Sequence, residues 1–314
     1  MIETVVSVEL PINEQLVIRK QRILPLGGLK GGEKRISVVT GIHGDELEGQ
    51  YTVFELARRI RANQECLNAI VDIYPAMNPM GIDSIIRGIP AFDLDMNRIF
   101  PGNEDGSMAE YTAAKIIQDV KGSDIAFDLH ASNMFLTEIP QIRISEETAE
   151  RLVPLAKHAN VDFIWVHGAA TVLESTFAHS MNDIGTPTLV VEAGVGMRIT
   201  KHYGEQIAEG ILNVMREMGM WAGETGPVRE PIISDDPNDV SFLNAAASGI
   251  FIPAVKHGAM LTKGELVGEI VDPLTTTVLS EVRSPVDGYL FTIREYPVVD
   301  EGSLMGRILG GVTR

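Results

Sequence analysis

The sequence predicts an α/β protein: a mixed, largely parallel sheet flanked by helices, followed by a smaller all-β domain of the barrel-sandwich type. Apolar, β-branched runs alternate with helical patterns between residues 36 and 220, and strands alternating with crossover helices form largely parallel sheets. The segment ETGPVREPIISDDPND (224–239) breaks this alternation with three prolines and several acids. Short strands and turns follow it. We therefore expect one domain over residues 1–224 and a β domain over 225–314.

Hydrophobic periodicity places the elements of the larger domain in chain order. Strands are predicted at 36–42, 69–76, 124–131, 163–168 and 187–194, and helices at 46–62, 108–122, 145–159 and about 203–219. Gly122 would end the second of these helices, and Ser145 would cap the third beside acidic first-turn residues. The order of the strands in the sheet cannot be read from this pattern.

A weak internal repeat marks the C-terminal region. GELVGEI (264–270) and GSLMGRI (302–308) share the pattern G-x-L-x-G-x-I, and SPVDGYL (284–290) lies between them. Two half-units of this kind resemble the barrel-sandwich hybrid of biotinyl and lipoyl carrier domains. Thr277 stands where such carriers have their modifiable lysine. A carrier function is therefore disfavoured, and we expect this domain to be structural or to form a rim of the active site.

Composition excludes several classes of partner and site. The chain has 26 basic and 43 acidic residues and a formal charge of −17, which disfavours binding to nucleic acid and to anionic membranes. A single cysteine, Cys66, excludes an internal disulfide and a cysteine-based zinc site. Neither a transmembrane run nor a signal peptide is expected. We expect a cytoplasmic protein with a small-molecule substrate, and leave homo-oligomerisation open.

Ionisable residues stand at the ends of three predicted strands. The first strand leads to His43 and Glu46, the third to His130 and the last to Glu192. In open parallel α/β sheets ligands bind beyond the carboxyl ends of the strands. Two histidines and a glutamate form the ligand set of many catalytic zinc sites, and Glu192 remains as a base for the attacking water.

Each of these residues also has a simpler interpretation. His43 and Glu46 could belong to an ordinary strand-to-helix turn, because short H-x-x-E matches occur by chance. His130 could be a hydrogen-bonded core histidine, and Glu192 could be salt-bridged at a sheet edge. Their convergence at one end of the sheet favours a metal site.

The stretch RGIPAFDLDMNRIFPG (87–102) lacks helical or strand periodicity and is predicted to be an ordered loop. It mixes acids, arginines and an asparagine with apolar residues. Arg98 could form bidentate hydrogen bonds with a substrate carboxylate. The alternative is internal pairing of Arg98 with Asp93 or Asp95.

Four ordered motifs resemble one known family. H-G-D-E at 43–46, D-M-N-R at 95–98, D-L-H at 128–130 and V-E-A-G at 191–194 are similar to those of the succinylglutamate desuccinylase/aspartoacylase family, within the zinc carboxypeptidases of the carboxypeptidase A type. The resemblance covers about residues 36–220, and the closing β domain also looks like that of bacterial members.

The resemblance implies roles for the matching residues. One zinc ion per chain would be bound by His43, Glu46 and His130, with Asp95 fixing the orientation of a ligating histidine. The remaining implied roles concern substrate and catalysis: Asn97 and Arg98 would hold the substrate carboxylate, Arg87 would polarise the scissile carbonyl, and Glu192 would take a proton from the attacking water and pass it to the leaving amine.

We therefore expect domain 1–224 to be a zinc-dependent hydrolase that removes the acyl group from a small N-acylated amino acid or related amine. Family members that cleave N-acetylaspartate have an additional arginine before the V-E-A-G glutamate, whereas STFAHSMNDIGTPT (175–188) contains none. His179 or Asn182 could take that place, and a neutral or basic substrate side chain is at least as well suited as an acidic one. The alternatives are a metallocarboxypeptidase acting on short peptides and a non-catalytic protein that binds zinc or a small carboxylate.

Overall fold

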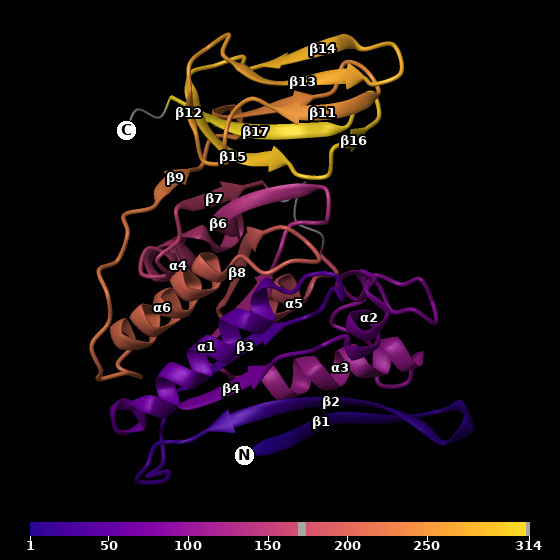
Figure 1. Ribbon diagram of the computed structural model, residues 1–314. Coiled ribbons are helices and arrows are strands. Elements are labelled where there is room, and N and C mark those ends of the chain that lie inside the picture. Colours follow the sequence, from indigo (N-terminus) through magenta and orange to yellow (C-terminus); the bar gives the residue numbers. More distant parts are fainter. Residues whose placement is uncertain (169–173, 312–314) are drawn as a thin grey trace.

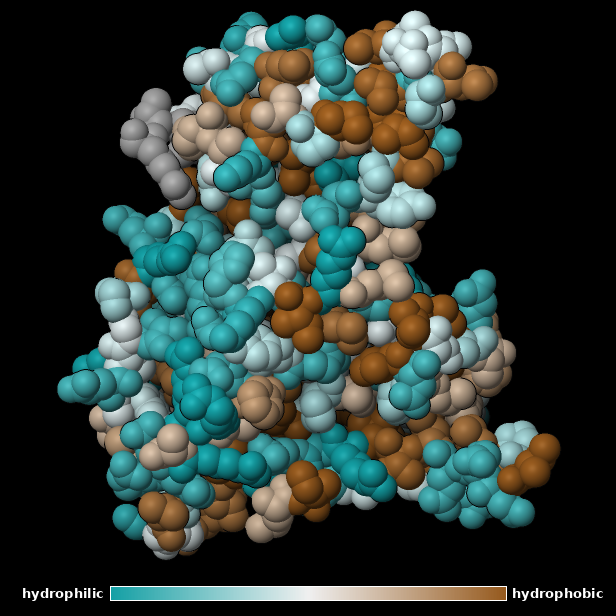
Figure 2. All heavy atoms as spheres, in the orientation of Figure 1, coloured by the Kyte–Doolittle hydropathy of each residue, from teal (hydrophilic) through white to brown (hydrophobic). Residues whose placement is uncertain are grey.

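The structure is a computed structural model that describes residues 1–168 and 174–311. It has two parts, one above the other in Figure 1: a large α/β domain and a C-terminal β domain. Figure 2 shows a narrow waist where the two join. The main sheet runs in the order β1-β2-β4-β3-β5-β8-β6-β15-β17-β10 and so extends through both parts.

The described residues form the following elements. The helices are α1 (Glu48–Ala62), α2 (Pro79–Ser84), α3 (Met108–Val120), α4 (Glu146–Ala156), α5 (Phe177–Asp183) and α6 (Lys201–Glu217). The strands of the α/β part are β1 (Ile2–Leu10), β2 (Glu14–Ile23), β3 (Arg35–Thr40), β4 (Ile70–Tyr74), β5 (Ile125–His130), β6 (Leu136–Ser145), β7 (Phe163–His167) and β8 (Thr188–Gly194). Those that follow are β9 (Ile232–Ser234), β10 (Val240–Asn244), β11 (Gly249–Pro253), β12 (Met260–Leu261), β13 (Leu266–Asp272), β14 (Thr277–Arg283), β15 (Gly288–Arg294), β16 (Val298–Val299) and β17 (Leu304–Gly310).

The centre of the sheet is parallel, and helices cover both of its faces. Strands β4, β3, β5 and β8 run parallel to one another. One apolar core joins the sheet to α1, α4 and α6, and a second joins its other face to α3, α5 and the β1–β2 hairpin. Because parallel strands are buried on both faces, they consist largely of apolar β-branched residues. The predicted α/β class is therefore confirmed.

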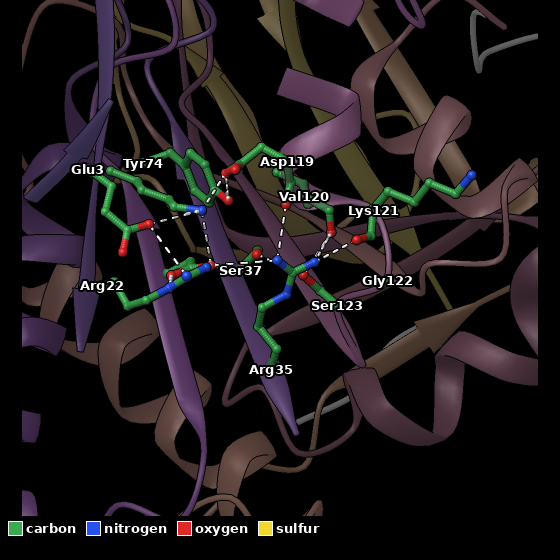
Figure 3. Close-up of polar contacts among 12 residues, drawn as sticks. Glu3, Arg22, Arg35, Ser37, Tyr74, Asp119, Val120, Lys121, Gly122 and Ser123 are labelled. Carbon is green, nitrogen blue, oxygen red and sulfur yellow. Dashed lines mark hydrogen bonds and ion pairs between the residues drawn. The ribbon is translucent and has the colours of Figure 1, made fainter. Parts of the chain in front are cut away.

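A buried network of charges ties the N-terminal hairpin to the sheet and to α3 (Figure 3). Lys20 on β2 is 3% exposed, and its Nζ lies 2.6 Å from Asp119 and 3.5 Å from Asp72. Arg22 donates two hydrogen bonds to Asp72, at 2.7 and 2.6 Å. The Tyr74 hydroxyl donates to Asp119 at 2.6 Å. Buried charges are tolerated only when they are paired in this way.

The C-terminal domain is an antiparallel β-sandwich, as expected. Its outer sheet has the order β14-β13-β11-β16, and it packs against β10, β15 and β17 through a core that includes Phe251, Leu290 and Met305. Strand β15 pairs with β6 of the larger domain. A second small core at this junction contains Phe163 from the larger domain and Phe291 from the sandwich.

Several details differ from the sequence prediction, which did not include strands β1 and β2 or the short helices α2 and α5. Strand β6 was not predicted either; it runs antiparallel to β8, which makes the sheet mixed, as expected. Ser145 does stand at the N-cap of α4, but its hydroxyl contacts the Thr148 hydroxyl at 2.9 Å instead of capping a backbone N–H. Gly122 follows the end of α3 with a φ of +80°, as a glycine there should.

The boundary near residue 224 stays a prediction. Residues 224–231 form neither helix nor strand, yet β9 directly afterwards pairs with β7 of the larger domain. None of the helices in the described ranges is both long enough and apolar enough to span a bilayer.

Candidate active site

Two histidines and a glutamate converge at the carboxyl edge of the parallel strands. His43 follows β3, Glu46 lies in the turn before α1, and His130 ends β5. One ligand atom from each of the three lies within 4.8 Å of the others, and all three side chains are buried. Both Nδ1 atoms face the same carboxylate: Nδ1 of His43 is 2.8 Å from Glu46 Oε1, and Nδ1 of His130 is 2.9 Å from Oε2.

The H-G-D-E turn requires its glycine because helix α2 packs against it. A Cβ atom added at Gly44 would overlap the backbone of Gly81 in α2. The amide of Gly44 also donates to the carbonyl of Arg87 at 3.1 Å. This close approach places His43 beside the loop that carries Arg87.

Each histidine has a second carboxylate on its other ring nitrogen. Nε2 of His43 is hydrogen-bonded to Asp95 Oδ1 at 3.1 Å, and Nε2 of His130 lies 3.1 Å from Asp128 Oδ1. Carboxylates placed behind histidines orient the rings of metal-binding sites. Asp128 was missed by sequence reasoning, although it stands two residues before His130 in a strand and therefore on the same face.

Because acidic side chains and imidazoles lie close together here, the pKa of Glu46 and the pKa of His130 shift in opposite directions. Burial acts to raise the pKa of Glu46, but His43 and His130 overcome this and hold it well below its usual range. Burial acts to lower the pKa of His130, but Asp128 and Glu46 raise it well above normal. The cluster therefore favours positive charge at its centre. His43 Nδ1 is moreover buried, and although Glu46 Oε1 lies 2.8 Å away, the two atoms are not aligned as a hydrogen bond.

Glu192 lies on β8, and it is the register partner of His130 on β5. It lines the same cavity as the cluster, which has a volume of about 780 Å³. Burial raises the pKa of Glu192, while Arg143 opposes the rise. Nη1 of Arg143 lies 3.4 Å from Glu192 Oε1. A carboxylate with a raised pKa is suited to accepting a proton near neutral pH.

The loop predicted at 87–102 contributes three residues to the cavity. Arg87 lies beside the cluster, with Nη1 2.9 Å from Glu46 and Nε 3.2 Å from Asp95. Asn97 Oδ1 accepts from the backbone N–H of Phe177 at 2.8 Å, which leaves its Nδ2 as the remaining donor. Arg98 donates to the carbonyl of Asn97. Within the described ranges Arg98 pairs with no carboxylate, so the internal pairing with Asp93 or Asp95 is not seen.

The structure thus brings together all eight residues that were selected from the sequence. Asp95 lies directly behind the cavity, hydrogen-bonded to His43. The other seven line the cavity: His43, Glu46, Arg87, Asn97, Arg98, His130 and Glu192. His179 and Asn182 also line this cavity. The Asn182 amide, however, is engaged with Thr188 and Arg151. Glu138 and Arg307, which the sequence did not indicate, also line this cavity.

The fold and site define an α/β protein with a His–Glu–His cluster and a nearby carboxylate at the carboxyl edge of its sheet. Residues 33–218 match the sequence model of the succinylglutamate desuccinylase/aspartoacylase catalytic domain. The chain belongs to this family.

Similar proteins extend the match over nearly the whole chain. The N-alpha-acetyl-L-2,4-diaminobutyric acid deacetylase of Halomonas elongata is 28% identical over 297 residues, which cover 92% of this chain and 86% of that one. The fold matches the product-bound ectoine utilization protein EutE (DoeB) of Ruegeria pomeroyi with a TM-score of 0.81 at 20% identity, over 96% and 92% of the two chains. It also matches a succinylglutamate desuccinylase/aspartoacylase of Rhodobacter sphaeroides with a TM-score of 0.79 at 23% identity, over 98% and 95%.

Proposed function

We propose that this protein is a zinc-dependent deacylase, which hydrolyses the amide bond of a small N-acylated amino acid. The observation that carries the proposal is the buried His43–Glu46–His130 cluster, which shares one cavity with Glu192. The Halomonas relative, named as a deacetylase of an N-acetylated diamino acid, supports the same reaction class.

The side chains of the cluster suit a zinc ion. Two imidazole nitrogens and a carboxylate oxygen are a common donor set of catalytic zinc. His43 Nδ1 lies 2.8 Å from Glu46 Oε1 without an aligned hydrogen bond, so both atoms are suited to bind one ion. His43, Glu46 and His130 would hold the ion, with Asp95 and Asp128 orienting the rings. When bound, zinc would supply Lewis acidity toward the carbonyl and make the attacking water more acidic.

The other residues of the cavity handle charge and protons. Glu192 takes a proton from the water as it attacks the amide carbonyl, and then delivers a proton to the nitrogen of the leaving amine. The C–N bond breaks, and the products are a carboxylate and a free amine. Arg87, at the rim of the cluster, stabilises the negative charge that develops on the carbonyl oxygen.

Asn97 and Arg98 hold the α-carboxylate of the substrate. Arg98 is suited to this because no carboxylate of the described residues occupies it, and the Asn97 Nδ2 donor lies beside it in sequence. Acidic side chains line the cavity near α4 and α5, among them Glu147, Glu150 and Asp183. Together with the lack of arginine over 175–188, they favour a substrate side chain that is neutral or carries an amine.

The size of the cavity favours small substrates over peptides. It measures about 780 Å³, within the range of sites for small molecules. Arg307 of the C-terminal domain contributes to its lining. A β domain in this place would leave little room for a long peptide, so the carboxypeptidase reading is not favoured.

The test is a hydrolysis screen on the purified full chain. The panel contains N-acetyl and N-succinyl derivatives of 2,4-diaminobutyrate, ornithine, glutamine, aspartate and glutamate, with dipeptides beside them, and amine release is measured. We expect the diamino acid derivatives to be turned over, with loss of activity on chelation and recovery on adding Zn²⁺. Release of C-terminal residues from peptides, or chelator-resistant hydrolysis, would contradict the proposal.

A further inference from the structure

We propose that Arg307 of the C-terminal domain is a positioning residue for Glu192, acting through Glu138 and Arg143. This inference rests on the proposed function, in which Glu192 is the general base. It assigns the β domain a part in catalysis: the domain supplies the charge that keeps the base in place.

The first observation is a row of side chains that crosses the junction between the two domains. Glu138 on β6 is the register partner of Thr292 on β15, and Thr292 is the partner of Arg307 on β17. Directly opposed residues of neighbouring strands have side chains on the same face, about 5 Å apart. The pairing of β6 with β15 therefore brings Arg307 to Glu138.

The second observation is that Glu138 is buried and receives hydrogen bonds from both domains. It is 1% exposed. Arg307 Nη1 donates to its Oε1 at 2.5 Å, and Thr292 Oγ1 donates to the same atom at 3.4 Å. Arg143 Nη2 donates to both carboxylate oxygens, at 3.0 and 2.9 Å. A buried carboxylate depends strongly on such partners, because removing one leaves uncompensated charge.

The third observation is that Arg143 links Glu138 to the base. Its Nη2 is on Glu138, while its Nη1 lies 3.4 Å from Glu192 Oε1. The two nitrogens belong to one rigid, planar guanidinium. A shift of the group toward Glu138 must therefore change its distance from Glu192.

Charge balance gives the direction of the effect. The charged row at the junction contains two carboxylates, Glu138 and Glu192, and two guanidiniums, Arg143 and Arg307. Without Arg307, Glu138 keeps Arg143 as its only cationic partner among the described residues. We expect Arg143 then to move toward Glu138 and to release Glu192.

The same contacts argue against a substrate-carboxylate subsite at this place. Arg143 and Arg307 are both already paired with Glu138, in contrast to Arg98. A subsite would predict that losing Arg307 raises KM. A positioning role predicts that kcat falls while KM is kept, because the interaction matters for proton transfer and not for binding.

The experiment compares four variants of the zinc-loaded enzyme on the substrate that the wild type turns over best. These are Arg307→Met, Arg307→Lys, the double variant Glu138→Gln/Arg307→Met, and Arg283→Met as the matched control. Arg283 pairs with Glu281 on the exposed face of the same domain, away from the cavity. Metal content and kcat and KM are measured for each, and crystal structures are determined for Arg307→Met and the wild type.

We expect Arg307→Met to lower kcat about 10-fold to 100-fold, with KM within about threefold of the wild type and metal content unchanged. Arg307→Lys should keep an intermediate kcat. The double variant should recover most of the lost kcat, because Arg143 then has no charged partner at position 138 and stays paired with Glu192. Arg283→Met should behave as the wild type. In the crystal structure of Arg307→Met, the Arg143 guanidinium should lie farther from Glu192.

An unchanged kcat, a rise in KM alone, or a double variant no better than Arg307→Met would overturn the proposal. If Arg307→Met does not fold, Arg307→Lys and the double variant decide by the same criteria. A wild type that hydrolyses nothing in the panel would count against the proposed function instead. Even then, an unmoved Arg143 in the Arg307→Met crystal would refute the link to Arg307.

Discussion

The two histidines of the cluster are arranged alike. Each directs Nδ1 toward Glu46 and has a carboxylate near Nε2, Asp95 for His43 and Asp128 for His130. A carboxylate in that position holds the proton on Nε2 and leaves the Nδ1 lone pair toward the centre of the cluster. Asp95 and Asp128 are therefore expected to matter for metal affinity as much as for folding.

Asp128→Asn is predicted to weaken zinc affinity about 10-fold to 100-fold, because a neutral amide accepts a weaker hydrogen bond from His130 Nε2 and orients the imidazole less firmly than a carboxylate does. Competition against a chromophoric chelator at constant pH measures the change. Asp124→Asn is the control, since Asp124 lies at the opposite end of β5, where it accepts from the amide of Arg35. Equal affinities of Asp128→Asn and the wild type would remove Asp128 from the metal site.

Glu192→Gln is predicted to lower kcat by about 10²-fold to 10⁴-fold, the usual contribution of a general acid–base. Metal content should stay at the wild-type level, because Glu192 is outside the three-residue cluster. Steady-state kinetics and elemental analysis of the same preparation provide both readouts. Unchanged turnover would show that the base has been assigned wrongly, and loss of metal would show a ligand role.

The site residues that could be predicted are those whose position follows from their local spacing in the sequence. His43, Glu46, His130 and Glu192 follow predicted strands, so their common location came from the rule for parallel sheets. Glu138 and Arg307 could not be found in that way, because they are 169 positions apart and meet only through strand pairing across the domain junction.

The composition of β6 explains why this strand escaped prediction. This strand carries Glu138, Gln141 and Arg143 in buried or half-buried positions, so it lacks the apolar character of a central strand. Its charges are compensated by residues from β8 and β17, which no local pattern reports. The strands and helices with clear periodicity were found, with small differences at their ends.

Helices α1 and α6 are joined by a chain of charges, and this predicts an acid-sensitive contribution to stability. Glu55 on α1 accepts hydrogen bonds from Arg58 and Arg59, and Arg59 pairs with Glu209 on α6. The hydrogen bond from Arg58, opposed by burial and reinforced by Arg59, lowers the pKa of Glu55 to about 2. Because the folded-state pKa lies below the unfolded value, the contribution is complete above that unfolded value and is lost as pH falls toward 2.

Glu55→Gln is therefore predicted to lower the free energy of unfolding by about 1 kcal/mol at pH 7, a value typical of partly exposed ion pairs. The difference from the wild type should shrink between about pH 4.5 and pH 2. Urea unfolding at a series of pH values measures it, with Glu281→Gln as a control at an exposed pair. A difference that is constant over this range would contradict the account.

The two domains share a sheet and a core. Strand β15 pairs with β6, and β9 returns to pair with β7. The junction core combines Ile139 and Phe163 of the larger domain with Phe291 and its neighbours in the sandwich. Separating the two domains would expose these buried side chains to water. We infer that the C-terminal domain stabilises the active-site edge of the sheet.

This shared core predicts that both domains unfold together. Trp165 contacts Phe291 of the sandwich, whereas Trp221 is buried in the core of the larger domain. The fluorescence of a Trp165→Phe variant, which retains only Trp221, therefore reports on the larger domain, and far-UV circular dichroism reports on the whole chain. The urea transitions followed by fluorescence and by circular dichroism should coincide, as two-state unfolding requires.

Phe291→Ala should lower the free energy of unfolding by about 3–5 kcal/mol, because Phe291 is fully buried, and should move both transitions equally. Leu274→Ala, at a side chain 92% exposed, should move neither. A circular dichroism transition that precedes the fluorescence transition would mean that the sandwich unfolds independently.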